Sequence, residues 1–64
     1  MVKVNGKPED AAGRTLAQYL KEKSFDFKRV AAELNGDIVP KAQYDTTVLR
    51  DGDELEVVSF VGGG

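Results

Sequence analysis

Short stretches in which apolar and polar residues alternate recur along the chain, and this period of two is typical of half-buried β-strands. Residues 2–4 alternate in this way and are followed by Asn5-Gly6, a pair that supplies the two positive φ angles of a type I′ hairpin turn. The chain returns over residues 7 to about 12, so the first two strands are predicted to pair antiparallel. Pro8 cannot donate a ladder hydrogen bond, which favours an edge position for the second strand.

The pattern changes to a helical period after residue 14. Thr15 and Gln18 have the spacing of a capping box, in which the Thr hydroxyl and the Gln side chain each accept a hydrogen bond from a free backbone N–H group. The predicted helix has two to three turns, too few to persist unless it packs on the sheet. Phe25 and Phe27 are expected to seal its end onto the core. The apolar residues of the helix share one face: Leu16, Tyr19 and Leu20.

The second half of the chain repeats the hairpin pattern. An apolar stretch at 30–34, the pair Asn35-Gly36 and a second stretch at 37–39 predict two more strands. Residues 41–45 read as an irregular or short helical crossover, and a last strand is expected at about 54–61. The order strand, strand, helix, strand, strand, strand predicts an α+β fold, with a mixed sheet of four to five strands packed on one main helix.

The period of the last strand assigns its side chains to two faces. If Leu55 and Val57 point into the core, Ser59 shares their side, whereas Val58 and Phe60 point outward. Val58 and Phe60 are therefore candidates for an exposed apolar patch that docks a partner. Two alternatives remain open: Phe60 folds over local apolar surface, or a one-residue slip exchanges the two faces.

Composition narrows the classes of function. A chain of 64 residues forms one domain with a small core, too small for a catalytic cleft of usual volume, so a self-sufficient enzyme is not expected. The absence of Cys and His removes disulfides, thiolate and imidazole nucleophiles, and the usual soft metal ligands. With no long apolar stretch and no signal pattern, a soluble cytoplasmic protein is expected.

The net charge of −2 hides an asymmetry between the two halves of the chain. Residues 1–30 hold seven Lys/Arg and four Asp/Glu, whereas residues 31–64 hold two and seven, which leaves the second half at about −5. This charge argues against nucleic acid as a partner and suits docking onto a basic protein surface; ordinary solvated surface charge is the alternative. No membrane partner is expected, since the chain has no long apolar stretch. Asp51 and Asp53, together with Asp45, could be imagined as a hard-metal site, but the spacing of Asp51 and Asp53 on either side of Gly52 is ordinary turn chemistry, so no metal site is predicted. Four acidic residues are expected to crowd the approach to the carboxyl end: Asp51, Asp53, Glu54 and Glu56.

The last three residues are Gly62, Gly63 and Gly64, and we expect the carboxylate of Gly64 to be the functional group of the chain. Glycine backbone is narrow and pliable, so such a segment can enter a slot too tight for side chains. We expect a domain of residues 1–61 and a flexible Gly-Gly-Gly tail at 62–64 that is mobile in the free protein. Ordinary fraying or a cloning remnant is the alternative interpretation of a glycine run judged alone.

Five motifs, taken in order, carry a resemblance to a known family. They are Val4-Asn5-Gly6, Thr15-Leu16, Leu34-Asn35-Gly36-Asp37-Ile38-Val39-Pro40, Leu49-Arg50-Asp51-Gly52-Asp53 and Val61-Gly62-Gly63-Gly64. Together they closely resemble the ThiS family, the sulfur carriers of thiamine biosynthesis, which have the ubiquitin-like β-grasp fold. The resemblance covers essentially the whole chain, and its one departure is Tyr44, where the family often has Trp.

The resemblance implies a chemistry for Gly64. A ubiquitin-activating-type (ThiF-like) adenylyltransferase would use ATP to convert its carboxylate to an acyl adenylate, while Gly62 and Gly63 thread the enzyme's active site. A sulfur donor system would then displace AMP and leave a thiocarboxylate, and a ThiG-like thiazole synthase would take the sulfur for the thiazole ring. The chain would itself be no enzyme and bind no cofactor, because ATP is used by the partner.

Other functions share the same features. A sulfur carrier for molybdopterin, tRNA thiolation or cysteine synthesis has the same activated Gly-Gly end. A ubiquitin-like protein modifier would be joined to target lysines and give conjugates of higher mass. A passive β-grasp interaction module would lose nothing if Gly63 and Gly64 were deleted.

Overall fold

The computed structural model describes residues 1–60 of the chain, and the elements in this part follow the predicted order. The predicted domain end at Val61 and the predicted tail, Gly62, Gly63 and Gly64, lie outside the described residues. No helix within residues 1–60 is both long enough and apolar enough to span a membrane.

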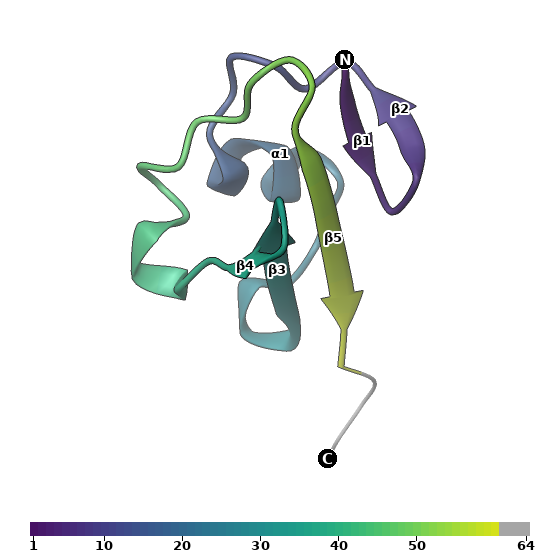
Figure 1. Cartoon of the computed structure of the whole chain (residues 1–64). Helices are drawn as coiled ribbons and strands as arrows, with labels where there is room; N and C mark the ends of the chain where they lie inside the picture. The colour runs from purple at the N-terminus through teal and green to yellow at the C-terminus, as the bar shows by residue number, and fades with distance from the viewer. Residues whose placement is uncertain (61–64) are drawn as a thin grey trace.

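Five strands form one mixed sheet with the order β2-β1-β5-β3-β4, shown in Figure 1. β1 and β5 run parallel, and the other neighbouring pairs are antiparallel. The sheet, with the one α-helix found within residues 1–60, is the ubiquitin-like β-grasp arrangement, which confirms the predicted fold. The strands are β1 (Val2–Val4), β2 (Lys7–Glu9), β3 (Val30–Leu34), β4 (Asp37–Ile38) and β5 (Glu54–Ser59).

Both predicted hairpin turns form because their residues tolerate a left-handed backbone. Asn5 and Gly6 have φ angles of 51° and 84°, and Asn35 and Gly36 have φ angles of 52° and 88°. The first hairpin is shorter than predicted. β2 ends at Glu9, because the chain then turns away from the sheet edge towards the helix.

The helix α1 (Leu16–Glu22) begins at Thr15 as predicted. The Thr15 hydroxyl accepts from the backbone N–H of Gln18 at 3.1 Å, and the Gln18 side chain accepts from the backbone N–H of Thr15 at 2.9 Å. The capping box is thus complete, which matters for a helix of seven residues that cannot persist on its propensity alone.

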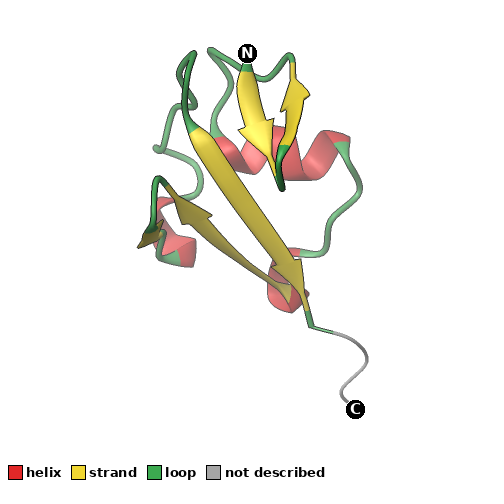
Figure 2. Cartoon of the chain, turned by 45° about the vertical axis from the view of Figure 1, so that its right-hand side comes forward, coloured by secondary structure: helices red, strands yellow, loops and turns green. Residues whose placement is uncertain are grey.

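The core lies between α1 and one face of the sheet. Figures 1 and 2 both show α1 behind the strands, so the viewer looks at the opposite face, called here the open face. Phe25 and Phe27 are partly buried and pack against the core, as predicted, and Phe27 meets Tyr44 edge to face with ring centroids 5.7 Å apart. The largest fully buried side chains are Tyr44, Leu16, Leu20, Leu49, Leu55, Val2 and Val30.

Two short 3₁₀ helices complete the fold. The predicted crossover contains η2 (Lys41–Gln43), whereas η1 (Phe27–Arg29) was not predicted. η1 begins at Asp26, whose carboxylate accepts from the backbone N–H of Lys28 at 2.9 Å. The described part of the last strand is also shorter than predicted, because β5 ends at Ser59.

Candidate functional site at the carboxyl-terminal strand

β5 is the central strand of the sheet and leads towards the carboxyl end of the chain. It pairs antiparallel with β3 in an unbroken register from Leu34↔Leu55 to Val30↔Ser59. The backbone N–H of Phe60 then donates to the carbonyl of Arg29 at 2.6 Å. The chain is therefore held on the sheet as far as Phe60, four residues before Gly64.

Two hairpin asparagines fasten β5 from both sides. The Asn5 amide nitrogen donates to the Val57 carbonyl at 3.2 Å, and its oxygen accepts from the Val57 backbone N–H at 2.9 Å. The Asn35 side chain accepts from the backbone N–H of Glu54 at 2.9 Å. The asparagines that form the two hairpin turns thus also hold the strand that leads to the carboxyl end.

The side chains of β5 divide between the two faces as predicted. Leu55 and Val57 are buried, with exposed fractions of 1% and 7%. Val58 and Phe60 are exposed by 57% and 55%, so the predicted register is correct. Ser59 has the period of the buried residues and is nevertheless exposed. Since both exposed apolar residues follow the buried part of β5, an apolar surface lies beside the end of the strand.

The expected position of the acidic turn was wrong. Asp51 and Asp53 precede β5, whereas Phe60 follows it, and a strand of six residues separates these points by roughly 20 Å. Figure 1 shows the start of β5 beside the amino terminus and its arrowhead at the opposite end. Asp51 pairs with the amino-terminal ammonium group of Met1. The predicted range of the strand already implied this separation, because a strand rises by about 3.3 Å per residue.

Asp53 has a structural role in the turn. One carboxylate oxygen accepts from the Asn35 amide at 3.0 Å, and the other accepts from the backbone N–H of Arg50 at 2.9 Å. Of the four predicted acidic residues, Glu54 and Glu56 are the two that lie on β5 itself, and both are exposed.

A residue missed in the sequence shares their surface. Glu33 on β3 lies opposite Glu56 on β5, and the hollow beside them has a volume of about 420 Å³. The exposed position of Glu33 inside an otherwise apolar stretch was the available signal, but its neighbour across the sheet depends on a pairing that the sequence does not reveal. The hollow is lined by Glu33, Asn35, Gly36, Glu54 and Glu56.

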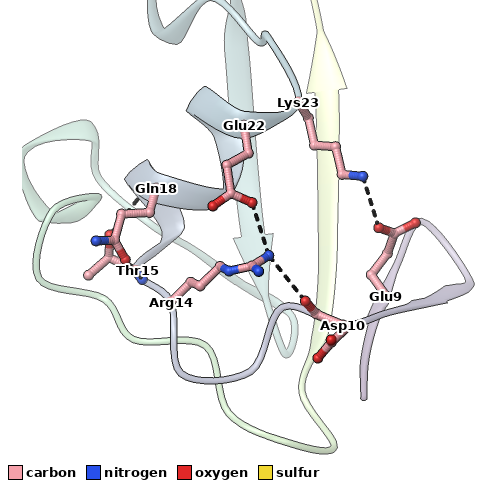
Figure 3. A network of polar contacts seen from close by, with 7 residues as sticks. All are labelled: Glu9, Asp10, Arg14, Thr15, Gln18, Glu22 and Lys23. Carbon is pink, nitrogen blue, oxygen red and sulfur yellow. Dashed lines mark hydrogen bonds and ion pairs between the residues drawn. The ribbon is translucent and has the colours of Figure 1, made fainter.

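A separate group of polar contacts joins the first hairpin to α1 (Figure 3). Lys23 pairs with Glu9 at 3.4 Å, and Arg14 pairs with Glu22 at 2.9 Å. Burial, with a smaller contribution from the nearby Glu9 carboxylate, raises the pKa of the Tyr19 phenol above its usual value. These contacts connect β2 and the loop before α1 to the helix and to the residue that follows it. In the described part of the chain, no group of three or more acidic residues is arranged to hold a metal ion.

Comparison with known proteins places these features in a family. The model of the ThiS family matches residues 2–64. The sulfur carrier protein ThiS of Thermus thermophilus is 39% identical over 64 residues, which cover both chains completely. The crystal structure of a thiamine biosynthesis protein (ThiS) from Geobacter metallireducens is 34% identical, covers 98% of this chain and 97% of that one, and superposes with a TM-score of 0.80.

Longer proteins also contain a similar segment. A thiazole synthase of Paramagnetospirillum magneticum is 42% identical over 62 residues, which are 95% of this chain and 19% of that protein. A thiazole synthase of Magnetococcus marinus is 41% identical over 64 residues. The chain therefore spans about a fifth of the length of the thiazole synthases that it matches.

Proposed function

The chain belongs to the ThiS family, the sulfur carriers of thiamine biosynthesis, and on this premise we propose that Gly64 carries the sulfur as a thiocarboxylate. The observation that carries this proposal is the family match over residues 2–64, which includes all three terminal glycines. The proposal requires Gly64 to end the chain with a free carboxylate.

The proposed chemistry has two steps. In the first, the Gly64 carboxylate attacks the α-phosphorus of ATP, so that pyrophosphate leaves and an acyl adenylate forms. In the second, a sulfide equivalent attacks the acyl carbon and AMP leaves with the electron pair of the broken C–O bond. Adenylation is needed because a carboxylate would otherwise have to expel oxide, and glycine leaves the acyl carbon unhindered.

The chain's own contribution is to present this carboxylate. The strand β5 is hydrogen-bonded on both sides, and its pairing continues to Phe60 through the bond to Arg29. Three glycines and one valine follow, so the reacting group can be no more than about 14 Å beyond Phe60. An enzyme that reacts with Gly64 therefore has to approach the end of β5 closely.

We propose two partners for this end of the molecule. The first is a ThiF-like adenylyltransferase, which would supply the ATP site of the reaction. The second is a thiazole synthase, and relatives of that name that contain a segment similar to this chain support a link between the two proteins. Val58, Phe60, Glu54 and Glu56 are the docking residues that the geometry favours, since they are exposed on or directly after β5.

The receiving pathway is tested by discharge of the charged protein. The thiocarboxylate form is mixed with thiazole synthase and its small substrates, or separately with the large subunit of molybdopterin synthase and its precursor. Intact mass then reports whether sulfur leaves Gly64. We expect return to the carboxylate mass, with formation of thiazole, only in the first mixture. Discharge only in the second would assign the carrier to another pathway.

A further inference from the structure

Within residues 1–60, the last backbone hydrogen bond of the carboxyl-terminal strand is made to η1 and not to β3. The backbone N–H of Phe60 donates to the carbonyl of Arg29 at 2.6 Å, and Arg29 is the last residue of η1. Figure 2 shows this helical turn beside the arrowhead of β5. The last anchor of the strand therefore belongs to a segment that precedes β3 in the chain.

The same turn interrupts the ladder at this point. Arg29 and Phe60 continue the register of Val30 and Ser59, and opposed residues of a bonded antiparallel pair exchange two N–H···O bonds. The N–H of Arg29 is not available for the second bond, because it donates to the Asp26 carbonyl at 2.9 Å. Arg29 thus offers Phe60 an acceptor without a donor, and the ladder loses its regular continuation here.

Asp26 holds the turn that has these two effects. Its carboxylate accepts from the backbone N–H of Lys28 at 2.9 Å, while its carbonyl accepts from the N–H of Arg29. A side-chain acceptor in this position satisfies an N–H group that the start of a helix leaves free. The Arg29 Nε atom also lies 3.7 Å from the second carboxylate oxygen, but the two side chains are 62% and 58% exposed, so this ion pair contributes little.

The apolar side of η1 is fixed independently of Asp26. Phe27 is partly buried against the core and its ring meets Tyr44, and Val30, the residue after η1, is 1% exposed. These contacts keep the segment on the domain whatever residue stands at position 26. A change at the exposed Asp26 side chain is therefore expected to loosen the turn without unfolding the domain.

We propose that Asp26 is a positioning residue for the reaction at Gly64. Through η1 it fixes the Arg29 carbonyl and so makes Phe60, four residues before Gly64, the last residue anchored to the sheet. The inference rests on the proposed function and adds to it a residue far from the carboxyl end in the chain. Asp26 acts through Arg29 and Phe60 and is assigned no contact with the reacting atoms.

The anchor matters because it sets the length of chain that separates the sheet from the carboxylate. Bonded and non-bonded pairs alternate along the ladder, so loss of the Phe60 bond makes Ala31 and Val58 the last bonded pair. Six residues instead of four would then follow the anchor, and the maximum reach would grow from about 14 Å to about 21 Å. Such lengthening lowers the effective concentration of a tethered group roughly twofold, and loss of alignment with the α-phosphorus of ATP lowers the rate further.

The test compares three variants of the full-length chain. Asp26→Ala removes the acceptor for the Lys28 N–H, and Asp26→Asn keeps an acceptor oxygen but removes the charge. Thr15→Ala is the matched control, because it removes the corresponding cap from α1. Hydrogen exchange of the Phe60 amide is measured by NMR without a partner. Single-turnover adenylation by an excess of purified ThiF-like adenylyltransferase then gives the maximal rate constant and, from its dependence on enzyme concentration, the affinity.

We expect Asp26→Ala to speed exchange of the Phe60 amide about fivefold, the factor that a lost helix cap typically contributes to local opening. Its maximal rate constant of adenylation should fall at least about twofold, while the affinity for the enzyme stays unchanged. Asp26→Asn and Thr15→Ala should keep the wild-type values of the Phe60 exchange rate, the rate constant and the affinity.

Several results would overturn the inference: an unchanged Phe60 exchange rate in Asp26→Ala, faster exchange without slower adenylation, or a loss of affinity in place of rate. An equal loss of rate in Thr15→Ala would assign the effect to general stability, and an equal loss in Asp26→Asn would assign it to charge; either would also overturn it. Failure of the wild-type chain to be adenylated would instead overturn the proposed function, on which the exchange measurement does not depend.

Discussion

Asn5 and Val57 are 52 positions apart in the chain, yet the Asn5 side-chain amide forms hydrogen bonds with both backbone polar groups of Val57. The amide thus acts like one more residue of a strand paired with β5. Because Asn5 also adopts the positive φ of the hairpin turn, one residue serves the local turn and the long-range attachment of the carboxyl-terminal strand.

This relationship predicts that Asn5→Asp destabilises the domain although the two side chains have the same shape. The substitution replaces the amide donor with a carboxylate oxygen that faces the Val57 carbonyl, and the loss of such a partly buried bond costs about 1–3 kcal/mol. Urea unfolding measures the difference. Gln43→Glu, which adds the same charge at an exposed position, is the control and should change the free energy of unfolding by less than about 0.5 kcal/mol. Equal stability of Asn5→Asp and wild type would show that the bond from the Asn5 amide to the Val57 carbonyl contributes nothing.

Truncation of side chains on the two faces of β5 is predicted to change the free energy of unfolding by unequal amounts. Leu55→Ala removes a buried side chain and should lower the free energy of unfolding by about 2–5 kcal/mol, a large share of the stability of so small a domain. Val58→Ala should change it by less than about 0.5 kcal/mol, because Val58 is exposed. Thermal and urea unfolding of both variants check this. A large loss of stability in Val58→Ala would remove the basis for treating that residue as a free docking group.

The capping box predicts a cost for Thr15→Ala of about 1 kcal/mol, since one free N–H group of a seven-residue helix loses its acceptor. Thr15→Ser keeps the hydroxyl and should retain most of the stability. The free energy of unfolding of the two variants, measured in urea, separates loss of the cap from loss of packing. A similar loss in both would point to the Thr15 methyl group instead.

The raised pKa of Tyr19 predicts that the folded protein loses stability at alkaline pH. Its pKa is raised in the folded state, first by burial and then by Glu9, so the native protein holds the phenol proton at a pH where the unfolded chain has released it. The contribution of the protonated Tyr19 phenol to stability is fully present below about pH 10, which is the ordinary pKa of tyrosine. It is lost as the pH rises through the pKa of Tyr19 in the folded state. Tyr19→Phe cannot titrate and should show a smaller decline above about pH 10. An identical pH profile of the two proteins would contradict this.

The elements that the sequence predicts well are those encoded by neighbouring residues. Asn5-Gly6 and Asn35-Gly36 formed the predicted hairpin turns because positive φ angles are a property of those residues. The Thr15 cap likewise needs only residues within one helical turn. The inward and outward sides of β5 followed from the period of two, which does not depend on the neighbouring strands.

Features that depend on which strands are neighbours could not be predicted. The parallel pairing of β1 with β5 and the opposition of Glu33 and Glu56 join segments whose relative position no local pattern determines. Asp51 and Asp53 were expected near the end of the chain, whereas the length of β5, which the predicted strand range already contained, places them at its other end. The Asn5 bonds to Val57 became visible only with the fold.

The central claim, that Gly64 is the sulfur-carrying group, is tested most directly by intact mass. The full chain is incubated with ATP, sulfide and a ThiF-like adenylyltransferase, beside a variant that lacks Gly63 and Gly64. We predict that the full chain exchanges one oxygen for one sulfur, that fragmentation places the change on Gly64, and that the truncated variant keeps its mass. The claim would be contradicted if the folded full chain kept its mass while the same enzyme modified its own carrier protein in a parallel reaction.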